Sequence, residues 1–266
     1  MTPHQKHIKA ASKLLRSSAY HHNLHALFRD CMEAAAISIS NSVDIRNREL
    51  RERRYLEIVG AYERKIVDVF PQVFAEIVMA LEQEPGDVLG AIYMDLELGS
   101  ADKGQFFTPY PVCRAMAEMT LADVDELNEL IERNGFVSAM EPACGAGAMI
   151  IALTEAMRER SINYQRHLHV TAVDIDRHVA HMAYIQFALL HIPAVVFVGN
   201  SLSLEMREAW HTPAHILGGW SARLACRDAE AAAKALVERP PEPAVIAPVS
   251  APPSGRSQRP HQLSLF

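Results

Sequence analysis

The stretch "EPACGAGAM" at residues 141–149 decides the fold class of this 266-residue chain. An acid and a proline are followed by small residues and two glycines, and short apolar runs flank the stretch on both sides. A glycine loop between a strand and a helix lets a ligand approach the backbone closely. The spacing differs from the dinucleotide fingerprint G-x-G-x-x-G, and by itself the loop is also compatible with a tight structural turn.

Strand and helix patterns alternate around this loop. "FVSAM" predicts a short buried strand before it, and Ile150, Leu153 and Met157 mark a helix after it. "HLHVTAV" predicts a second strand, "DIDRHVAHMAYIQFALL" a second helix and "AVVFVGN" a third strand. Such alternation implies parallel βα units, and therefore an α/β, Rossmann-like, doubly wound sheet.

Residues 1–98 read as a helical domain. Apolar residues recur at helical spacing within 22–39 and again within 56–81, where Pro71 is expected to kink or restart the helix. No strand pattern precedes residue 135. Further on, Pro111 suits the first turn of a helix, and Gly135 is expected to end the next one.

The rest of the chain divides into three parts. Residues 99–237 hold the sheet domain. Residues 238–260 are rich in Pro, Ala and Ser and predict a disordered linker, and residues 261–266 are apolar again. The chain leaves about 17 residues between position 220 and the linker, so the sheet is expected to be truncated, with its flank covered by the N-terminal helices or by a second copy in a homodimer.

The charge is unevenly distributed. The formal net charge is −6, yet residues 1–66 carry 12 Lys and Arg against 7 Asp and Glu. The densest basic run, "RNRELRERR" at 46–54, is either a solvated helix face or a surface that contacts phosphates.

Cysteine usage and hydropathy indicate the compartment. Cys31, Cys113, Cys144 and Cys226 are scattered without a CxxC pair, which argues against a zinc site and for a reducing cytoplasm. The sequence lacks both a run of 18 apolar residues and an apolar signal core at its start, so a membrane span and secretion are not expected.

Polar residues follow the predicted second and third strands. Asp174 immediately follows an apolar run and can accept hydrogen bonds from two ribose hydroxyls. Asp176 is better suited to cap the following helix. Asn200 ends the third strand and can both donate and accept, as recognition of an adenine edge requires.

Taken in order, "GQFFTP" at 104–109, "EPACGAG", "VDID" and "GNSL" resemble the adenine-N6 DNA methyltransferases, and most closely the modification subunits of type I restriction systems. The resemblance covers about residues 86–220 and implies S-adenosylmethionine as the cofactor. The residues it assigns to the cofactor site are Phe107, Thr108, Pro109, Glu141, Pro142, Ala143, Cys144, Gly145, Asp174, Ile175 and Asn200. Because methyl transfer to nitrogen needs no enzyme nucleophile, Cys144 is not expected to act as one.

The chain departs from this family at the catalytic motif, (N/D/S)-P-P-(Y/F/W). In the family, that segment accepts the hydrogens of the adenine amino group and stacks on the flipped base. The nearest match here is "TPAH", in which Thr212, Pro213, Ala214 and His215 would take the four places. The alternative is a turn without a catalytic role.

The sequence therefore predicts an adenine-N6 DNA methyltransferase without an attached nuclease, with double-stranded DNA lying over the helical domain and residues 212–220. Trp210 and Trp220 are candidates for stacking or wedging, or for packing in the core. Two other functions are retained. One is a catalytically silent or partner-activated module that binds S-adenosylmethionine and DNA, and the other is a protein methyltransferase.

The C-terminal pentapeptide "QLSLF" at 262–266 resembles the motif that binds the bacterial sliding clamp. Gln262, Leu263, Leu265 and Phe266 match its anchor positions, and the Pro-rich segment before it would act as a tether. The alternative is that these residues dock onto their own domain or onto a second copy.

Overall fold

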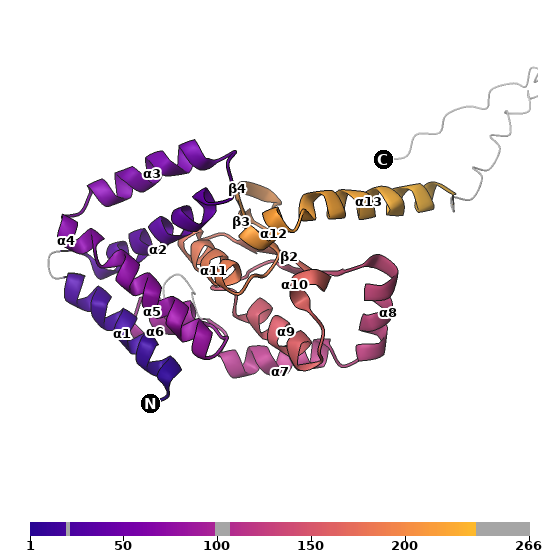
Figure 1. Cartoon of the computed structure of the whole chain (residues 1–266), viewed down its shortest axis with the longest axis horizontal. Coiled ribbons are helices and arrows are strands. Elements are labelled where there is room, and N and C mark those ends of the chain that lie inside the picture. Colours follow the sequence, from indigo (N-terminus) through magenta and orange to yellow (C-terminus); the bar gives the residue numbers. More distant parts are fainter. Residues whose placement is uncertain (20–21, 99–106, 238–266) are drawn as a thin grey trace, which may run out of the picture. The chain divides into compact units, whose positions relative to one another are not determined.

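The computed structural model describes residues 1–19, 22–98 and 107–237 (Figure 1). Residues 104–106 of "GQFFTP", the predicted linker and the predicted clamp motif lie outside the described residues. Residues 1–227 form one compact unit, and residues 228–266 belong to a second.

The N-terminal part is helical, as predicted. Its helices are α1 (Pro3–Ser18), α2 (Leu24–Asn41), α3 (Arg48–Gly60), α4 (Arg64–Val67), α5 (Phe70–Gln83) and α6 (Val88–Asp95). The predicted restart is confirmed, since Pro71 lies in the first turn of α5, where its missing N–H has no cost. Helix α1 packs along α5, and both contribute apolar residues to the core.

The second part holds the sheet and its helices. Its elements are α7 (Tyr110–Thr120), α8 (Val124–Asn134), β1 (Val137–Glu141), α9 (Ala148–Glu159), α10 (Tyr164–His167), β2 (Leu168–Asp174), α11 (Arg177–Leu189), β3 (Ala194–Asn200), β4 (Glu205–His211), α12 (Pro213–Leu217) and α13 (Trp220–Val237). Pro111 lies in the first turn of α7, and Gly135 caps α8 with φ 78°, as predicted. The described residues before 135 contain no strand.

The four strands are ordered β1-β2-β3-β4. The pairs β1–β2 and β2–β3 are parallel, and the three predicted strands are present. Strand β1 is not buried as predicted, because its residues alternate between half-buried and exposed. Helices α9 and α11 connect them, which gives the mixed α/β, Rossmann-like architecture expected of a class I methyltransferase fold.

Strand β4 departs from the expected parallel pattern. It pairs antiparallel with β3, with Asn200 opposite Glu205 and Val195 opposite His211. A turn of four residues joins the two strands, and this is too short for the crossover that a parallel partner requires. The segment is therefore the second arm of a hairpin at the sheet edge, which explains its low apolar content.

One face of the sheet packs against the helices. Alternate residues of β2 and β3, such as Val170 and Val196, belong to the same core cluster as Leu15 of α1 and Ile77 of α5. The N-terminal helices therefore share a core with the sheet. Among the described residues, no helix combines the length and the apolar character needed to cross a membrane.

Candidate cofactor site

The glycine loop lies at the carboxyl end of β1, where α9 begins. Gly145 and Gly147 have φ values of 55° and 97°, a region that favours glycine. The amide of Gly145 donates to Asp174 Oδ2 at 2.9 Å, and the amide of Cys144 donates to the carbonyl of Val173 at 2.8 Å. The loop is therefore fixed to the end of β2.

Asp174 lies at the centre of this arrangement. Its Oδ1 accepts from the amide of Asp176 at 2.9 Å, while Oδ2 accepts from Gly145. Burial raises the pKa of the Asp174 carboxyl, and the backbone donors act in the opposite direction. Each carboxylate oxygen keeps a further lone pair that could accept a hydroxyl. Asp176 caps α11 by accepting from the amide of His178 at 2.9 Å, so its predicted role as a helix cap is confirmed.

Phe107 covers the loop. A Cβ on Gly145 would lie 3.3 Å from the Phe107 ring, which packs edge-on against Tyr93 with a centroid distance of 5.3 Å. Pro109 is the N-cap of α7, and the carbonyl of Thr108 accepts a weak bond from the Cys113 thiol at 3.8 Å. Of the predicted residues 107–109, Phe107 thus lies directly against the loop.

The loop residues divide between solvent and core. Pro142 and Ala143 are exposed, and Glu141 Oε1 accepts from the amide of Ala143 at 3.2 Å. Cys144 is 6% exposed, and burial raises the pKa of its thiol well above the ordinary value. A neutral buried thiol is a poor nucleophile, in agreement with the prediction that Cys144 does not act as one.

A hollow of about 500 Å³ adjoins the ends of β2 and β3. It is lined by Ile175, Asp176, Arg177, His178, Val198, Arg207 and Glu208. The Ile175 side chain is 63% exposed and offers an apolar surface for a flat ring. Asn200 Oδ1 accepts from the amide of Leu202 at 2.9 Å, so recognition of a ligand by this residue would rely on its amide nitrogen.

Residues 86–217 match the family model described as N-6 DNA Methylase. This segment resembles the N-6 DNA methylases. Its cofactor is S-adenosylmethionine. A search of curated proteins finds no significant match.

A solved structure from Listeria monocytogenes, described as a class I S-adenosylmethionine-dependent methyltransferase, is similar to this chain. The TM-score is 0.38 and the sequence identity is 14%. The similarity covers 72% of this chain and 52% of that one, so this chain spans about half the length of the other protein. The likeness is too distant to support an argument about the site.

The structure also contains a polar link to the glycine loop that the sequence did not reveal. The amide nitrogen of Gln186 donates to the carbonyl of Ala146 at 2.8 Å and to Asp87 Oδ1 at 3.0 Å. Its Oε1 accepts from the amide of Leu89 at 3.0 Å. Gln186 therefore joins α6 and α11 to the glycine loop. Its only signal in the sequence is a polar side chain within the apolar run "YIQFALL".

The predicted catalytic segment lies away from the glycine loop. Thr212 follows β4 and is next to the start of β3, because β4 runs antiparallel to β3. The seven residues of β3 span about 20 Å at about 3.3 Å per residue, and this length separates the segment from Asn200. The geometry corrects the assignment of Thr212, Pro213, Ala214 and His215 to catalysis.

The same segment has a structural role. The Thr212 hydroxyl donates to the carbonyl of Ile192 at 2.8 Å and accepts from the amide of Ala194 at 2.9 Å. His215 is buried and bonded to His169 at 2.9 Å and to the Ser221 hydroxyl at 2.9 Å. Residues 212–215 thus bond the loop that precedes β3 and begin helix α12. This agrees with the alternative given above, a turn without a catalytic role.

We expect Thr212→Val to lower the free energy of unfolding by about 2 kcal/mol, because it leaves the buried amide of Ala194 without its side-chain acceptor. Affinity for S-adenosylmethionine should change little. Denaturant unfolding and calorimetry measure the two quantities. Thr120→Val is the matched control, since the Thr120 hydroxyl bonds the carbonyl of Met116 on an exposed helix surface and its loss should cost much less. A stable variant with lost cofactor binding would contradict this structural role.

Both tryptophans belong to the protein interior. Trp210 and Trp220 are 5% and 1% exposed, which supports core packing over stacking on a base. The Arg51 guanidinium lies 4.1 Å from the centre of the Trp210 ring, and His181 packs edge-on against the same ring at 4.7 Å.

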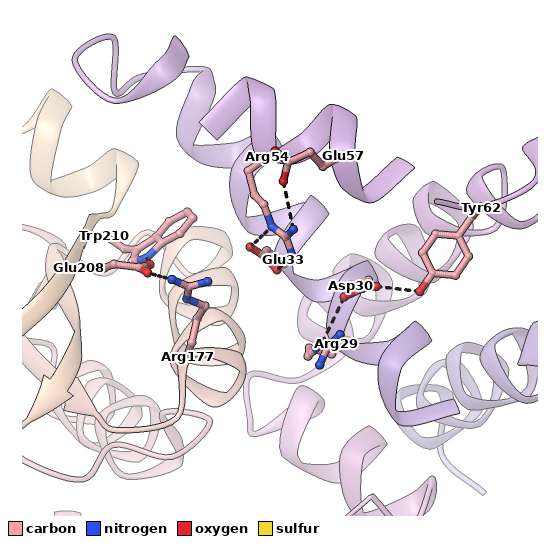
Figure 2. Close-up of polar contacts among 9 residues, drawn as sticks. All are labelled: Arg29, Asp30, Glu33, Arg54, Glu57, Tyr62, Arg177, Glu208 and Trp210. Atoms are coloured by element: carbon pink, nitrogen blue, oxygen red, sulfur yellow. Dashed lines mark hydrogen bonds and ion pairs between the residues drawn. The ribbon is translucent and has the colours of Figure 1, made fainter. Parts of the chain in front are cut away.

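Part of the positive charge of the basic run 46–54 is neutralised by ion pairs with carboxylates of the same chain. Figure 2 shows Arg54 between Glu33 and Glu57, with contacts of 2.9 Å and 3.3 Å. Arg51 is buried and bonds Asp44 at 2.6 Å. Two arginines of the run therefore fix α3 against α2 and the preceding loop. Arg46, Arg48 and Arg53 are exposed.

His181 predicts a dependence of stability on pH. It is fully buried, and burial lowers the pKa of its imidazole to about 3, against the smaller opposing effect of Glu33. Neither ring nitrogen has a hydrogen-bond partner among the residues that the structure describes. In the unfolded chain this histidine becomes protonated near pH 6.5, whereas in the folded chain its imidazole stays neutral. The free energy of unfolding therefore decreases as the pH falls from about 6.5 toward the pKa in the folded chain.

We expect His181→Leu to reduce the loss of unfolding free energy between pH 7.5 and pH 5 by about 2 kcal/mol, the cost linked to one histidine over that range. Urea unfolding at the two pH values measures this loss. The half-buried His167 at the end of α10 gives the comparison variant, His167→Leu, which removes a histidine that is not buried in the core. An unchanged slope in His181→Leu would show that this histidine titrates normally in the folded protein.

Proposed function

We propose that the chain binds S-adenosylmethionine against residues 141–149 and serves methyl transfer to adenine N6 of duplex DNA, as a relative of type I modification subunits. The observation that carries the proposal is the glycine loop held to Asp174, within a segment that matches the N-6 DNA Methylase family. When bound, S-adenosylmethionine supplies a methyl group activated by its sulfonium charge.

The residues present fit this cofactor. The absence of a side chain on Gly145 lets the Phe107 ring pack against the loop, next to the backbone proposed to hold the methionine part. The carboxylate of Asp174 offers acceptors for the ribose hydroxyls, and the exposed Ile175 offers an apolar contact for adenine. Glu141 and Asn200 lie at the ends of β1 and β3, on the same edge of the sheet.

A second candidate function follows from the position of residues 212–215. With this segment at the opposite end of β3, the groups that orient the adenine amino group must come from another part of the chain or from another chain. This favours a partner-activated subunit that binds S-adenosylmethionine and does not transfer methyl groups alone. The exposed Arg48 and Arg53 remain candidates for contacts with DNA phosphates in either case.

One experiment separates the candidates. The purified chain is incubated with labelled S-adenosylmethionine and mixed-sequence duplex DNA, with and without cell extract. Label on adenine N6 in the purified reaction supports the methyltransferase, and label that requires the extract supports the partner-activated subunit. Label incorporated equally with Asp174→Ala would reflect another enzyme. Absence of cofactor binding would contradict both candidates.

The proposal assigns the protein to the cytoplasm, in keeping with four unpaired cysteines. It also assigns the tail residues Gln262, Leu263, Leu265 and Phe266 to binding of a bacterial sliding clamp, on the resemblance of "QLSLF" alone. Such tethering would raise the effective concentration of the protein beside newly replicated DNA.

We expect the 257–266 peptide to bind a bacterial sliding clamp with micromolar affinity, and replacement of Leu265 and Phe266 by Ala to abolish binding, because these residues supply most of the apolar anchor area. Fluorescence anisotropy with labelled peptide measures this. Replacement of Ser264 by Ala is the control and should have little effect. Equal clamp binding by the full chain and a tail-deleted chain would overturn the assignment.

A further inference from the structure

Strand β1 is an edge strand of the described sheet, although it carries the glycine loop. It pairs with β2 in continuous register from Val137 to Glu141. Edge strands usually avoid association through a proline, a lysine, a bulge or a covering segment. The sequence "VSAME" contains neither proline nor lysine, and the register of β1 is unbroken. The free edge of β1 is therefore suited to pairing with another strand.

The sheet face next to this edge is also partly open. Met140 of β1 is 61% exposed and Met206 of β4 is 38% exposed, and Thr171 between them is partly exposed. Sheets with parallel strands are normally covered on both faces. A doubly wound sheet grows in both directions from its first strand, and ligands bind at the point where the strand order reverses. Such a sheet therefore has further strands on the other side of the first strand. Here β1 has no strand beyond it among the described residues.

The charges at the two ends of β1 are opposite in sign. Arg133 lies in the last turn of α8, just before β1, and Arg227 bonds the hydroxyl of Ser138 at 2.6 Å. Glu141 ends the strand, and its bond to the amide of Ala143 engages only Oε1. A second β1 that runs antiparallel would place the basic end of each strand beside the acidic end of the other.

We infer that β1 pairs antiparallel with β1 of a second copy of this chain, about a two-fold axis at Ala139. Each Ala139 then lies opposite its counterpart, and Ser138 lies opposite Met140 of the other copy on the partly open face. Two four-stranded sheets join into one of eight strands, which removes both free β1 edges. Arg227 of each copy lies near Glu141 of the other, so the second copy contributes a cation beside each glycine loop.

A disulfide test addresses this register directly. Residues opposite one another in an antiparallel pair have Cα atoms about 4.5–5.5 Å apart, within the range of a disulfide. Cys226 is exposed and is first replaced by Ser, while Cys31, Cys113 and Cys144 are buried. Ala139→Cys in this background should form a covalent dimer on mild oxidation. Thr171→Cys, on the partly open face of the internal strand β2, should not.

Light scattering tests the association itself. The chain of 29.6 kDa should have twice that mass at micromolar concentration, and Met140→Lys should shift it to the monomer with cofactor binding retained as a check of the fold. Arg227→Glu should raise the dimer dissociation constant about tenfold or more. A monomer across this range, or a dimer in which Ala139→Cys forms no disulfide, would overturn the inference. Neither result bears on cofactor binding by the single chain.

Discussion

Asp174→Ala is expected to weaken S-adenosylmethionine binding about a hundredfold, equivalent to about 3 kcal/mol. The substitution removes the acceptor of the Gly145 amide and the acceptor proposed for the ribose hydroxyls. Hydrogen bonds to a charged group contribute about 1.5–3 kcal/mol each. Because the carboxylate that fixes the loop is also the proposed ligand acceptor, its removal is expected to weaken binding both by disordering the loop and by deleting a contact.

Isothermal calorimetry on the folded variant measures this loss. Asp123→Ala is the matched control, because Asp123 caps α8 by accepting from the amide of Glu126 at 2.9 Å and takes no part in the loop. It should cost about 1 kcal/mol of stability with unchanged affinity. Unchanged affinity in Asp174→Ala, with the fold intact, would remove Asp174 from the cofactor site.

Gly147→Ala is expected to lower the free energy of unfolding by about 2–5 kcal/mol. Gly147 has φ 97°, outside the common region for residues with a side chain, and this alone costs about 1–2 kcal/mol. A Cβ at this position would also lie 2.5 Å from Phe187 Cε1. Phe187 is fully buried within α11 and cannot move without disturbing the core, which costs a further 1–3 kcal/mol or so.

Gly135→Ala separates the two causes. Gly135 also has a positive φ, of 78°, but a Cβ there would meet nothing within 4 Å. Its effect should therefore be limited to about 1–2 kcal/mol. Chemical denaturation of both variants gives the comparison. If both variants lose the same free energy of unfolding, Phe187 moves to accommodate the added methyl group, and only the backbone conformation requires glycine at position 147.

The sequence was sufficient where local chemistry decides structure. Three apolar runs, each followed by a polar or glycine residue, became β1, β2 and β3. Strands β2 and β3 are buried, as continuous apolar residues indicate, whereas the prediction of a buried β1 is wrong because this strand lies at the edge of the described sheet. Pro71, Pro111 and Gly135 began or ended helices as predicted, since their backbone restrictions act independently of the rest of the fold. The resemblance to N-6 DNA methylases agrees with the family model that residues 86–217 match, because its motifs are short and contiguous.

Tertiary structure decided what depends on partners distant in the chain. The direction of β4 follows from the turn after Asn200 and carries Thr212 to the far end of β3, which no reading of "TPAH" alone reveals. The arginines of 46–54 looked alike in sequence, yet Arg51 and Arg54 bond carboxylates at positions 44 and 33 while Arg48 and Arg53 face solvent. Gln186 became a bridge to the glycine loop only when α11 lay beside it. The local sequence determines a helix or strand because the backbone requirements of that element are met within a few residues. The role of a polar side chain depends instead on the groups that folding brings within hydrogen-bond distance of it.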